Sequence, residues 1–381
     1  MLETSSPENI GNINRSAIVK ILKRKGPMTR SEISKELNLS FPAVSSNVKV
    51  LLDNNYIIYS DDFSHPTGMG RPSIMLEYNA KRAYVVGVCS DIRRIRAVCA
   101  DMIGNTVSSI EYENNLKMGG EHMYDLMRDS IQSVLDMAGV SYDNLECICV
   151  GIPGVFDEKL QKYRLVPFVT GWEDIGLSER IRNKFHTRVI EDNVVNLGAL
   201  GEYKHGVSQK CRNSVLIDFN IGIGAGIIIN GELYHGFNNA AGEIGYMMMD
   251  KYHLRYGFKN EGILEEILSG MNSGMPFESM EELIGNAKSG NINATQWLEE
   301  ITVYFSMLLA NISIVLNPEM IVFTGISAKT LYEYKKEYIM SILKAHIPYV
   351  PEIHLSKLGQ DASIVGAVEM ALNKVEEDTI Y

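Results

Sequence analysis

One stretch constrains the fold of this chain more than any other, and it runs from Ser214 to Tyr246. An apolar segment, 214–219, is followed by a glycine at every second position over 222–226 and by a second apolar segment, 227–229. The pattern predicts two strands joined by a glycine-rich turn, in which residues without Cβ let backbone N–H groups approach an anion. Tight hairpins also use glycine for conformational reasons alone, so the alternation by itself is weak evidence for a phosphate site.

The length and the cysteines set further bounds. A chain of 381 residues predicts two or three compact units. Its first ten residues lack the basic and apolar regions of a signal peptide, and we expect no membrane-spanning stretch, so a cytoplasmic protein without a membrane partner is predicted. Its five cysteines fit a reducing compartment, and Cys147 and Cys149 alternate within one strand, where small buried thiols are favoured over metal ligands.

Charge divides the chain into two parts. The net charge is −11, yet residues 10–60 hold eight Lys or Arg against three acidic residues. A basic segment in an otherwise acidic chain indicates that the two parts have separate functions.

The basic part has the pattern of three short helices. Residues 15–24 predict the first, and Thr29 begins the second as a Thr-x-x-Glu capping box. Ser40 or its neighbour is expected to cap a third helix from about Pro42 to Asp53. Segments 56–59 and 73–76 read as the two strands of a wing, so the unit is predicted to be a winged helix-turn-helix. A helical docking domain with a solvated basic face is the alternative, and the coincidence of charge, cap and turn favours DNA binding.

We expect the outward side of the third helix and its flanks to contact double-stranded DNA. No arginine on that helix is placed to read guanine, so the predicted readout is modest. Arg71 is expected either to enter an AT-rich minor groove or to touch phosphate or nothing. The candidate DNA-binding residues are Arg30, Ser40, Pro42, Ala43, Ser45, Ser46, Asn47, Lys49 and Arg71.

From residue 82 onward strands alternate with helices. Strands are predicted over 84–89, 95–101 and 106–112, followed by a helix over about 121–137 and a strand over 147–150. This β-β-β-α-β order supports an α/β class.

Motifs spread over nearly the whole chain resemble the ROK family, named for repressors, open reading frames and sugar kinases. Their order and spacing carry the resemblance. They are Gly70-Arg71-Pro72 after the wing, Gly151–Asp157 (GIPGVFD), Pro167–Trp172, Ala241–Gly245 (AGEIG), Asn317–Val322 (NPEMIV) and Asp361–Ala367 (DASIVGA).

The resemblance implies the fold. It implies a winged helix-turn-helix over 1–78 and, over 79–381, a two-lobed actin-like (ribonuclease H-like) ATPase/sugar-kinase fold. We expect the first lobe to comprise about 79–187 plus the C-terminal helix, and the second lobe to comprise about 188–360.

The groups that a kinase of this family needs are replaced. Val194 stands at the position of the general base, although a one-residue shift of the alignment would give that role to Asp192. The first phosphate loop holds Asp91 and Ile92 in place of two glycines, and the second holds Ile221 in place of a hydroxyl donor. Tyr246 replaces the zinc-binding histidine, no cysteine follows, and the remaining nearby histidine, His253, is expected on the surface. We therefore predict no catalytic residue, no metal and no cofactor.

In this family certain positions contact sugar hydroxyls, and four residues of this chain stand at positions that resemble them. Gly154, Asn193, Glu243 and Glu265 are the candidate effector-binding residues, with retention for folding as the alternative. The function predicted is a transcriptional repressor of carbohydrate-related genes, in which a homodimer or tetramer binds operator DNA and responds to a sugar or sugar phosphate. The alternatives are an ATP-dependent sugar kinase with an altered site and a repressor controlled by a protein partner.

Overall fold

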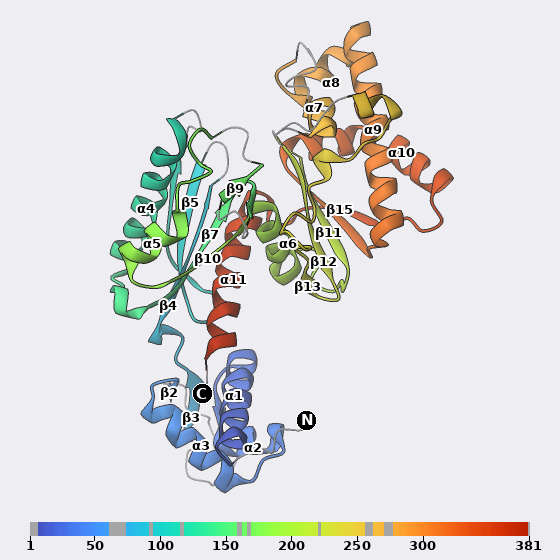
Figure 1. The fold of residues 1–381 in the computed structure, drawn as a ribbon. Helices are drawn as coiled ribbons and strands as arrows, with labels where there is room; N and C mark the ends of the chain where they lie inside the picture. Colours follow the sequence, from blue (N-terminus) through green and yellow to red (C-terminus); the bar gives the residue numbers. More distant parts are fainter. Residues whose placement is uncertain are drawn as a thin grey trace.

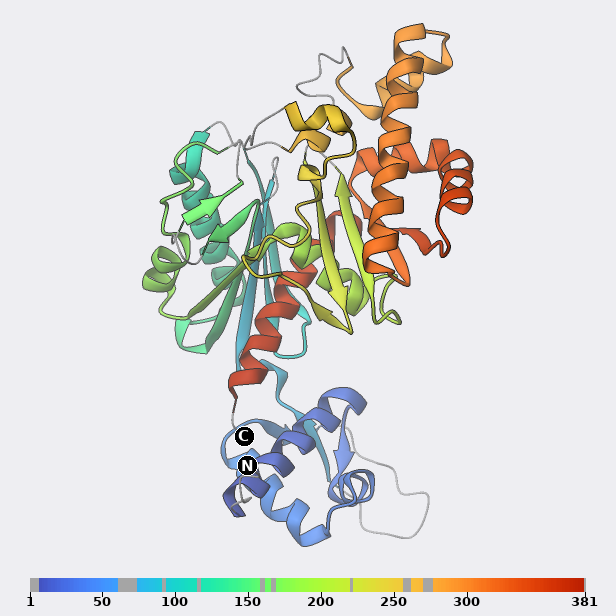
Figure 2. The same ribbon diagram turned by 45° about the vertical axis from the view of Figure 1, so that its right-hand side comes forward.

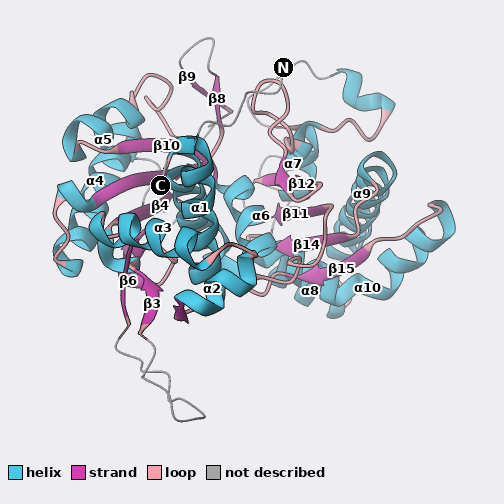
Figure 3. Ribbon diagram, turned by 90° about the horizontal axis from the view of Figure 1, so that it is seen from below, coloured by secondary structure: helices cyan, strands magenta, loops and turns pink. Residues whose placement is uncertain are grey.

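A helical N-terminal domain is followed by two α/β lobes that stand side by side (Figure 1). The computed structural model describes residues 7–60, 74–90, 94–114, 118–157, 162–165, 169–219, 222–255, 262–269 and 277–379. The last helix, α11 (Ala362–Asp378), descends from the lobes and ends beside the N-terminal domain (Figures 1 and 2). Seen from below, the N-terminal helices lie in front of the first lobe and the middle of the molecule (Figure 3).

The N-terminal domain is a winged helix-turn-helix, as predicted. Its small sheet has the order β1-β3-β2, so a short strand before the second helix, which the sequence analysis missed, joins the two wing strands. The elements are α1 (Pro7–Lys25), β1 (Met28–Thr29), α2 (Arg30–Leu37), α3 (Phe41–Asp53), β2 (Ile57–Tyr59) and β3 (Met75–Tyr78).

Local capping explains where the second and third helices begin. The Thr29 hydroxyl accepts a hydrogen bond from the Glu32 N–H, and the Glu32 carboxylate accepts one from the Thr29 N–H, which is the predicted capping box. Asn38 adopts the left-handed conformation (φ 53°) that ends α2. Ser40 caps α3 by accepting from the Ala43 N–H. The tight turn between the two helices therefore follows from local sequence.

The first lobe is built on a five-stranded sheet of order β10-β7-β4-β5-β6. The predicted β-β-β-α-β order is confirmed. Helices α4 and α5 lie on one side of this sheet (Figure 1), and α11 packs against β4 and β7. The elements are η1 (Ala80–Arg82), β4 (Tyr84–Ser90), β5 (Arg94–Asp101), β6 (Thr106–Glu113), α4 (Gly119–Ala138), η3 (Tyr142–Asn144), β7 (Leu145–Ile152), β8 (Val155–Asp157), β9 (Lys162–Arg164), α5 (Leu177–Phe185) and β10 (Arg188–Asn193).

The second lobe is built on a sheet of order β13-β12-β11-β14-β15. Its core holds the mutually tilted rings of Phe219, Phe305 and Phe323, and the centroid of Phe305 lies 6.2 Å from that of Phe219 and 5.3 Å from that of Phe323. The elements are α6 (Val194–His205), β11 (Ser214–Phe219), β12 (Ile223–Ile229), β13 (Glu232–Leu233), η4 (Ile244–Tyr246), η5 (Lys251–Arg255), α7 (Ile263–Ser269), α8 (Met280–Lys288), α9 (Ile292–Leu316), β14 (Met320–Thr324), α10 (Ile326–His346), β15 (Glu352–Leu355) and η6 (Gly359–Asp361).

The predicted boundary between the lobes at residue 188 is wrong. Strand β10 pairs in parallel with β7, with Arg188 opposite Cys147, and so belongs to the first sheet. Helix α6 follows directly and packs against α11, β11 and β12, so it lies where the two lobes meet. Sequence pattern did not reveal this because a buried parallel strand looks the same in either sheet.

Two further expectations concern buried segments. All five cysteines are buried, and Cys147 and Cys149 share one apolar cluster while Ile148 between them belongs to another, as their alternation predicts. Helix α9 is, against expectation, long and apolar enough to cross a membrane by length and composition, but half of its most apolar window is buried inside the protein. That burial is typical of the core helix of a globular lobe.

Candidate effector pocket and nucleic-acid interface

A pocket lies where α6, β12 and the loop before η4 meet, and it encloses about 210 Å³ of empty space, open solvent included. Three asparagine amides and the carboxyl of Glu243 lie in its lining, and such groups suit a ligand with hydroxyls. The lining residues are Asn193, Val195 and Asn196 from the start of α6, Gly224 and Ala225 from β12, and Asn239, Ala241, Gly242 and Glu243 from the loop.

Asn193 has a structural task in this pocket wall. Its side-chain oxygen accepts from the Val195 N–H at 2.7 Å, which caps α6, and its amide nitrogen donates to the Gly154 carbonyl at 3.0 Å. Two candidate residues, Asn193 and Gly154, are thereby joined. The amide retains one further N–H and one lone pair with which it could bind a ligand.

Glu243 and Glu265 lie close together at the same site. Burial, and next the charge of Glu265, raise the pKa of Glu243 to about 7. Glu265 accepts from the Gly262 N–H at 3.3 Å, and a Cβ on Gly222 would lie 2.5 Å from its Oε1. Glycine at 222 therefore leaves room for the Glu265 carboxylate. The structure brings all four candidate effector residues to one region, while their contact with a sugar stays a prediction.

A histidine–aspartate pair lies beside the pocket. His235 Nε2 is 2.7 Å from Asp192 Oδ2, and this hydrogen bond raises the pKa of the imidazole. The other oxygen, Asp192 Oδ1, accepts from the Asn193 N–H at 2.7 Å and from the Asn196 amide at 2.9 Å. His235 also accepts, through its carbonyl, from the N–H of pocket-lining Ala241. Asp192 is thus held by three donors from both sides of the pocket.

The alternating glycines at 224 and 226 let strand β12 pack against helix α6. A Cβ on Gly224 would meet the Val195 side chain at 3.2 Å, and one on Gly226 would meet the Val195 carbonyl oxygen at 2.6 Å. Only residues without a side chain let β12 lie this close to the start of α6. The turn itself, 220–221, lies outside the described residues, as do the first phosphate-loop positions 91–93.

The kinase and zinc positions can be placed in part. Val194 is the first residue of α6, and its side chain packs partly buried against the apolar cluster of the first lobe. His253 is buried at 6% exposure, stacks on the Tyr304 ring and accepts from the Met249 N–H, so its expected surface position is wrong. Among the residues that the structure describes, no three His, Cys, Asp or Glu side chains converge to hold a metal ion.

Helix α3, which is predicted to contact DNA, has one exposed face. Ser40, Pro42, Ser46 and Lys49 are exposed, and Arg30, Ala43 and Ser45 are half-buried. The expectation that Asn47 faces outward is wrong. Its side chain is 7% exposed and is turned inward, where its amide donates to the Ala43 carbonyl at 2.8 Å and its oxygen accepts from Arg15 at 3.4 Å. Arg71 lies outside the described residues.

Sequence reasoning also missed residues that the fold brings to these sites. Phe41, 52% exposed, stands at the start of α3, where an aromatic ring can contact a thymine methyl group. His235, Asn196 and Asn239 belong to the pocket region, and no local motif marks them. The sequence predicts Asp192 only as an alternative general base. The neighbouring polar residues Asn193 and Asn196 are the one signal in the sequence that marks a polar site there.

Two family models match the chain. The model of the ROK family matches residues 96–374, and that of a winged helix-turn-helix DNA-binding domain matches residues 12–58. The first match covers more than half of the chain. The protein is therefore a member of the ROK family that carries a DNA-binding winged helix-turn-helix.

Individual relatives of this chain include repressors and kinases. The xylose repressor of Bacillus subtilis is 25% identical over 373 residues, which is 96% of each chain. The crystal structure of a ROK family transcriptional regulator, a homologue of the Escherichia coli MLC protein, superposes with a TM-score of 0.72 at 21% identity over 97% of this chain and 99% of that one. A ROK hexokinase from Thermus thermophilus gives a TM-score of 0.66 at 22% identity over 77% and 99%. The two structures establish the fold.

Proposed function

We propose that this protein is a sugar-responsive transcriptional repressor whose kinase-like lobes bind a sugar without phosphorylating it. The observation that carries the proposal is the pairing, in one chain, of a DNA-binding domain with a polar pocket at the start of α6, where Val194 holds the predicted position of the general base. Val194 cannot accept a proton, and loss of a general base costs about 10²–10⁴-fold in rate. The xylose repressor, which matches nearly end to end, supports a regulator over an enzyme.

The chemistry of the pocket supports a neutral polyhydroxylated ligand. Asn193, Asn196 and Asn239 supply amide groups that both donate and accept, and Glu243, with its pKa near 7, can donate a proton as well as accept one. We take D-xylose as the first probe because of the relative's name, and N-acetylglucosamine, glucose and their phosphates as the comparison set.

The repressor acts as a homodimer or tetramer on an operator in the cytoplasm. A single winged helix reads few base pairs, and two-fold operators are read by two copies of a recognition helix. Ser46, Lys49 and the Pro42 edge of α3 are the proposed base and phosphate contacts, joined by Arg30 at the start of α2.

Thermal unfolding of the full chain with each probe, with and without ATP–Mg²⁺, tests the proposal. A ligand at a hundredfold its dissociation constant stabilises the folded state by about 2.7 kcal/mol. We expect one sugar to raise the melting temperature without ATP, and Glu243→Gln to reduce that shift. Glu333→Gln, an exposed position on α10, is the matched control and should leave it unchanged. A shift that requires ATP, or sugar-dependent ATP hydrolysis, would contradict a sensor.

One observation favours a second candidate, a sugar kinase with an altered base. The Asp192–His235 pair has the geometry in which a carboxylate orients an imidazole that takes a proton. Sugar-dependent ATP turnover that is lost in both His235→Asn and Asp192→Asn would establish this reading. Absence of turnover with every probe that binds supports the sensor.

A further inference from the structure

The pocket and the DNA-binding domain are joined by two helices whose backbones touch. A Cβ on Gly201 of α6 would lie 2.2 Å from the Ala362 carbonyl oxygen of α11, and one on Gly366 of α11 would lie 1.8 Å from the Leu197 carbonyl oxygen of α6. Both distances are far below van der Waals contact. Helices in direct backbone contact move together, because no flexible side chain lies between them to absorb a displacement.

The pocket end of this pair is the first turn of α6. Asn193 caps the helix there, and Val195 and Asn196 line the pocket. A ligand that shifts or orders this turn therefore acts on the helix that crosses α11.

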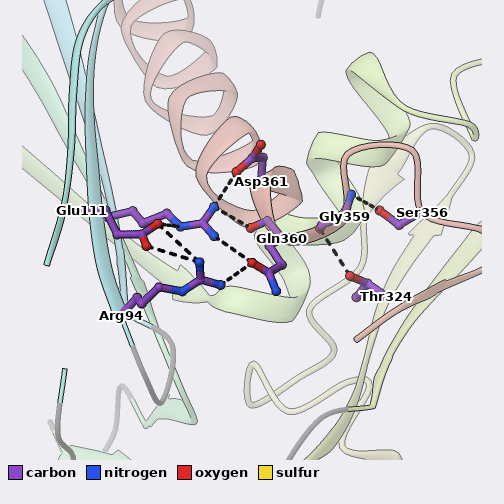
Figure 4. A network of polar contacts seen from close by, with 8 residues as sticks. Arg94, Glu111, Thr324, Ser356, Gly359, Gln360 and Asp361 are labelled. Carbon is purple, nitrogen blue, oxygen red and sulfur yellow. Dashed lines mark hydrogen bonds and ion pairs between the residues drawn. The ribbon is translucent and has the colours of Figure 1, made fainter. Parts of the chain in front are cut away.

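The start of α11 is held by both lobes (Figure 4). From the first lobe, Arg96 donates to the Gln360 carbonyl at 3.1 Å and pairs with Asp361. From the second lobe, Thr324 donates to the Gly359 carbonyl at 3.3 Å. Glu111 joins Arg94 and Arg96 into the same network. The start of α11 is therefore attached to both lobes.

The far end of α11 reaches the winged helix-turn-helix. Glu376 forms an ion pair with Lys23 of α1, and the Lys23 ammonium lies 4.5 Å from the centroid of the Tyr78 ring. The Lys23 side chain is 14% exposed and that of Glu376 is 40% exposed, so the pair lies at the edge of the contact between α1 and α11. Val375 of α11 and Leu22 of α1 belong to one continuous apolar cluster.

We propose that α6 and α11 form the connection through which the pocket and the DNA-binding domain influence each other, with Lys23–Glu376 as its contact to the domain. The proposal rests on the proposed function and specifies how it is regulated. A second attachment, at η1, where Ala80 accepts from the Met102 N–H, ties the domain to the first lobe alone and bypasses the pocket.

The test uses reciprocity, so it needs no identified sugar. A pocket ligand that changes DNA affinity has its own affinity changed by DNA by the same factor, so DNA that acts through this connection also acts on the pocket. The probe is a duplex that the full chain selects from a random-sequence library. Hydrogen exchange of the full chain is followed with and without that duplex. We expect DNA to change the exchange rates in the first turn of α6 and in α11. Helix α8, which lies away from both, should not change.

Variants separate the helix connection from the route through η1. In the double variant Lys23→Gln/Glu376→Gln, DNA should still protect α3 but should no longer change the exchange in α6. The charge exchange Lys23→Glu/Glu376→Lys should restore the DNA-dependent change in α6. Lys374→Gln with Glu377→Gln, an ion pair on the same helix, is the matched control. The proposal is overturned when DNA alters exchange only within residues 12–60, or when the change in α6 survives the Lys23/Glu376 double substitution. A library that yields no bound duplex refutes DNA binding itself.

Discussion

Replacing Glu243 by glutamine should make the stability of the protein less dependent on pH. Burial and the charge of Glu265 raise the pKa of Glu243 from 4.5 to about 7. Between these two values the folded protein holds a proton that the unfolded chain has released, so stability falls as pH rises through this window. Above pH 7 the full cost of the buried charge is present. Glutamine resembles the protonated acid in shape and never ionises.

The magnitude follows from the size of the shift. Each unit of pKa difference corresponds to about 1.4 kcal/mol. Between pH 5 and pH 8, the unfolding free energy of Glu243→Gln should therefore rise by about 2.5 kcal/mol relative to that of the unsubstituted protein. Urea unfolding at pH 5, 6, 7 and 8, compared for the protein, Glu243→Gln and the control Glu333→Gln, measures this difference. A gain that stays constant within about 0.5 kcal/mol across that range would refute the reasoning, since the carboxyl would then titrate alike in both states.

Four further outcomes are expected. Ser40→Ala removes the cap of α3 and should lower the unfolding free energy of the domain by about 1 kcal/mol in thermal unfolding. No change would show that the cap does not contribute to stability. Lys49→Ala should weaken binding of all duplexes and reduce the slope of log affinity against log salt by about 1, whereas Asn47→Ala should lower the melting temperature, because Asn47 is buried. Gly201→Ala should cost at least about 1–3 kcal/mol in urea unfolding, because its Cβ has no space; a neutral result would contradict the close helix crossing.

The fold was predictable where local chemistry decides it. Thr29, Glu32 and Ser40 begin helices through hydrogen bonds within three residues, and the strands of the first lobe follow from apolar runs between turns. Strand β10 was assigned to the wrong lobe because its partner, β7, lies about forty residues away in the chain. Which sheet a buried strand joins is decided by tertiary packing, not by its own pattern.

The site was predictable only in part. The motif residues Asn193, Glu243 and Glu265 do meet in space, yet the structure gives Asn193 a capping bond and turns Asn47 of the DNA-binding helix inward. Asn47 lies on the same buried side of α3 as Val48. A polar residue next to a core position is expected to face solvent, and here its side chain faces inward instead. His235 has no motif at all, since only the approach of the β13 loop to the end of β10 brings it to Asp192.

The most direct test of the central claim is a titration of the selected duplex with the full chain by fluorescence anisotropy, with and without the sugar that raises its melting temperature. The account predicts that saturating sugar changes the affinity for the duplex by at least about fivefold, the lower end of allosteric couplings. An affinity that saturating sugar leaves unchanged would contradict a sugar-responsive repressor, and the pocket would then have no part in regulation.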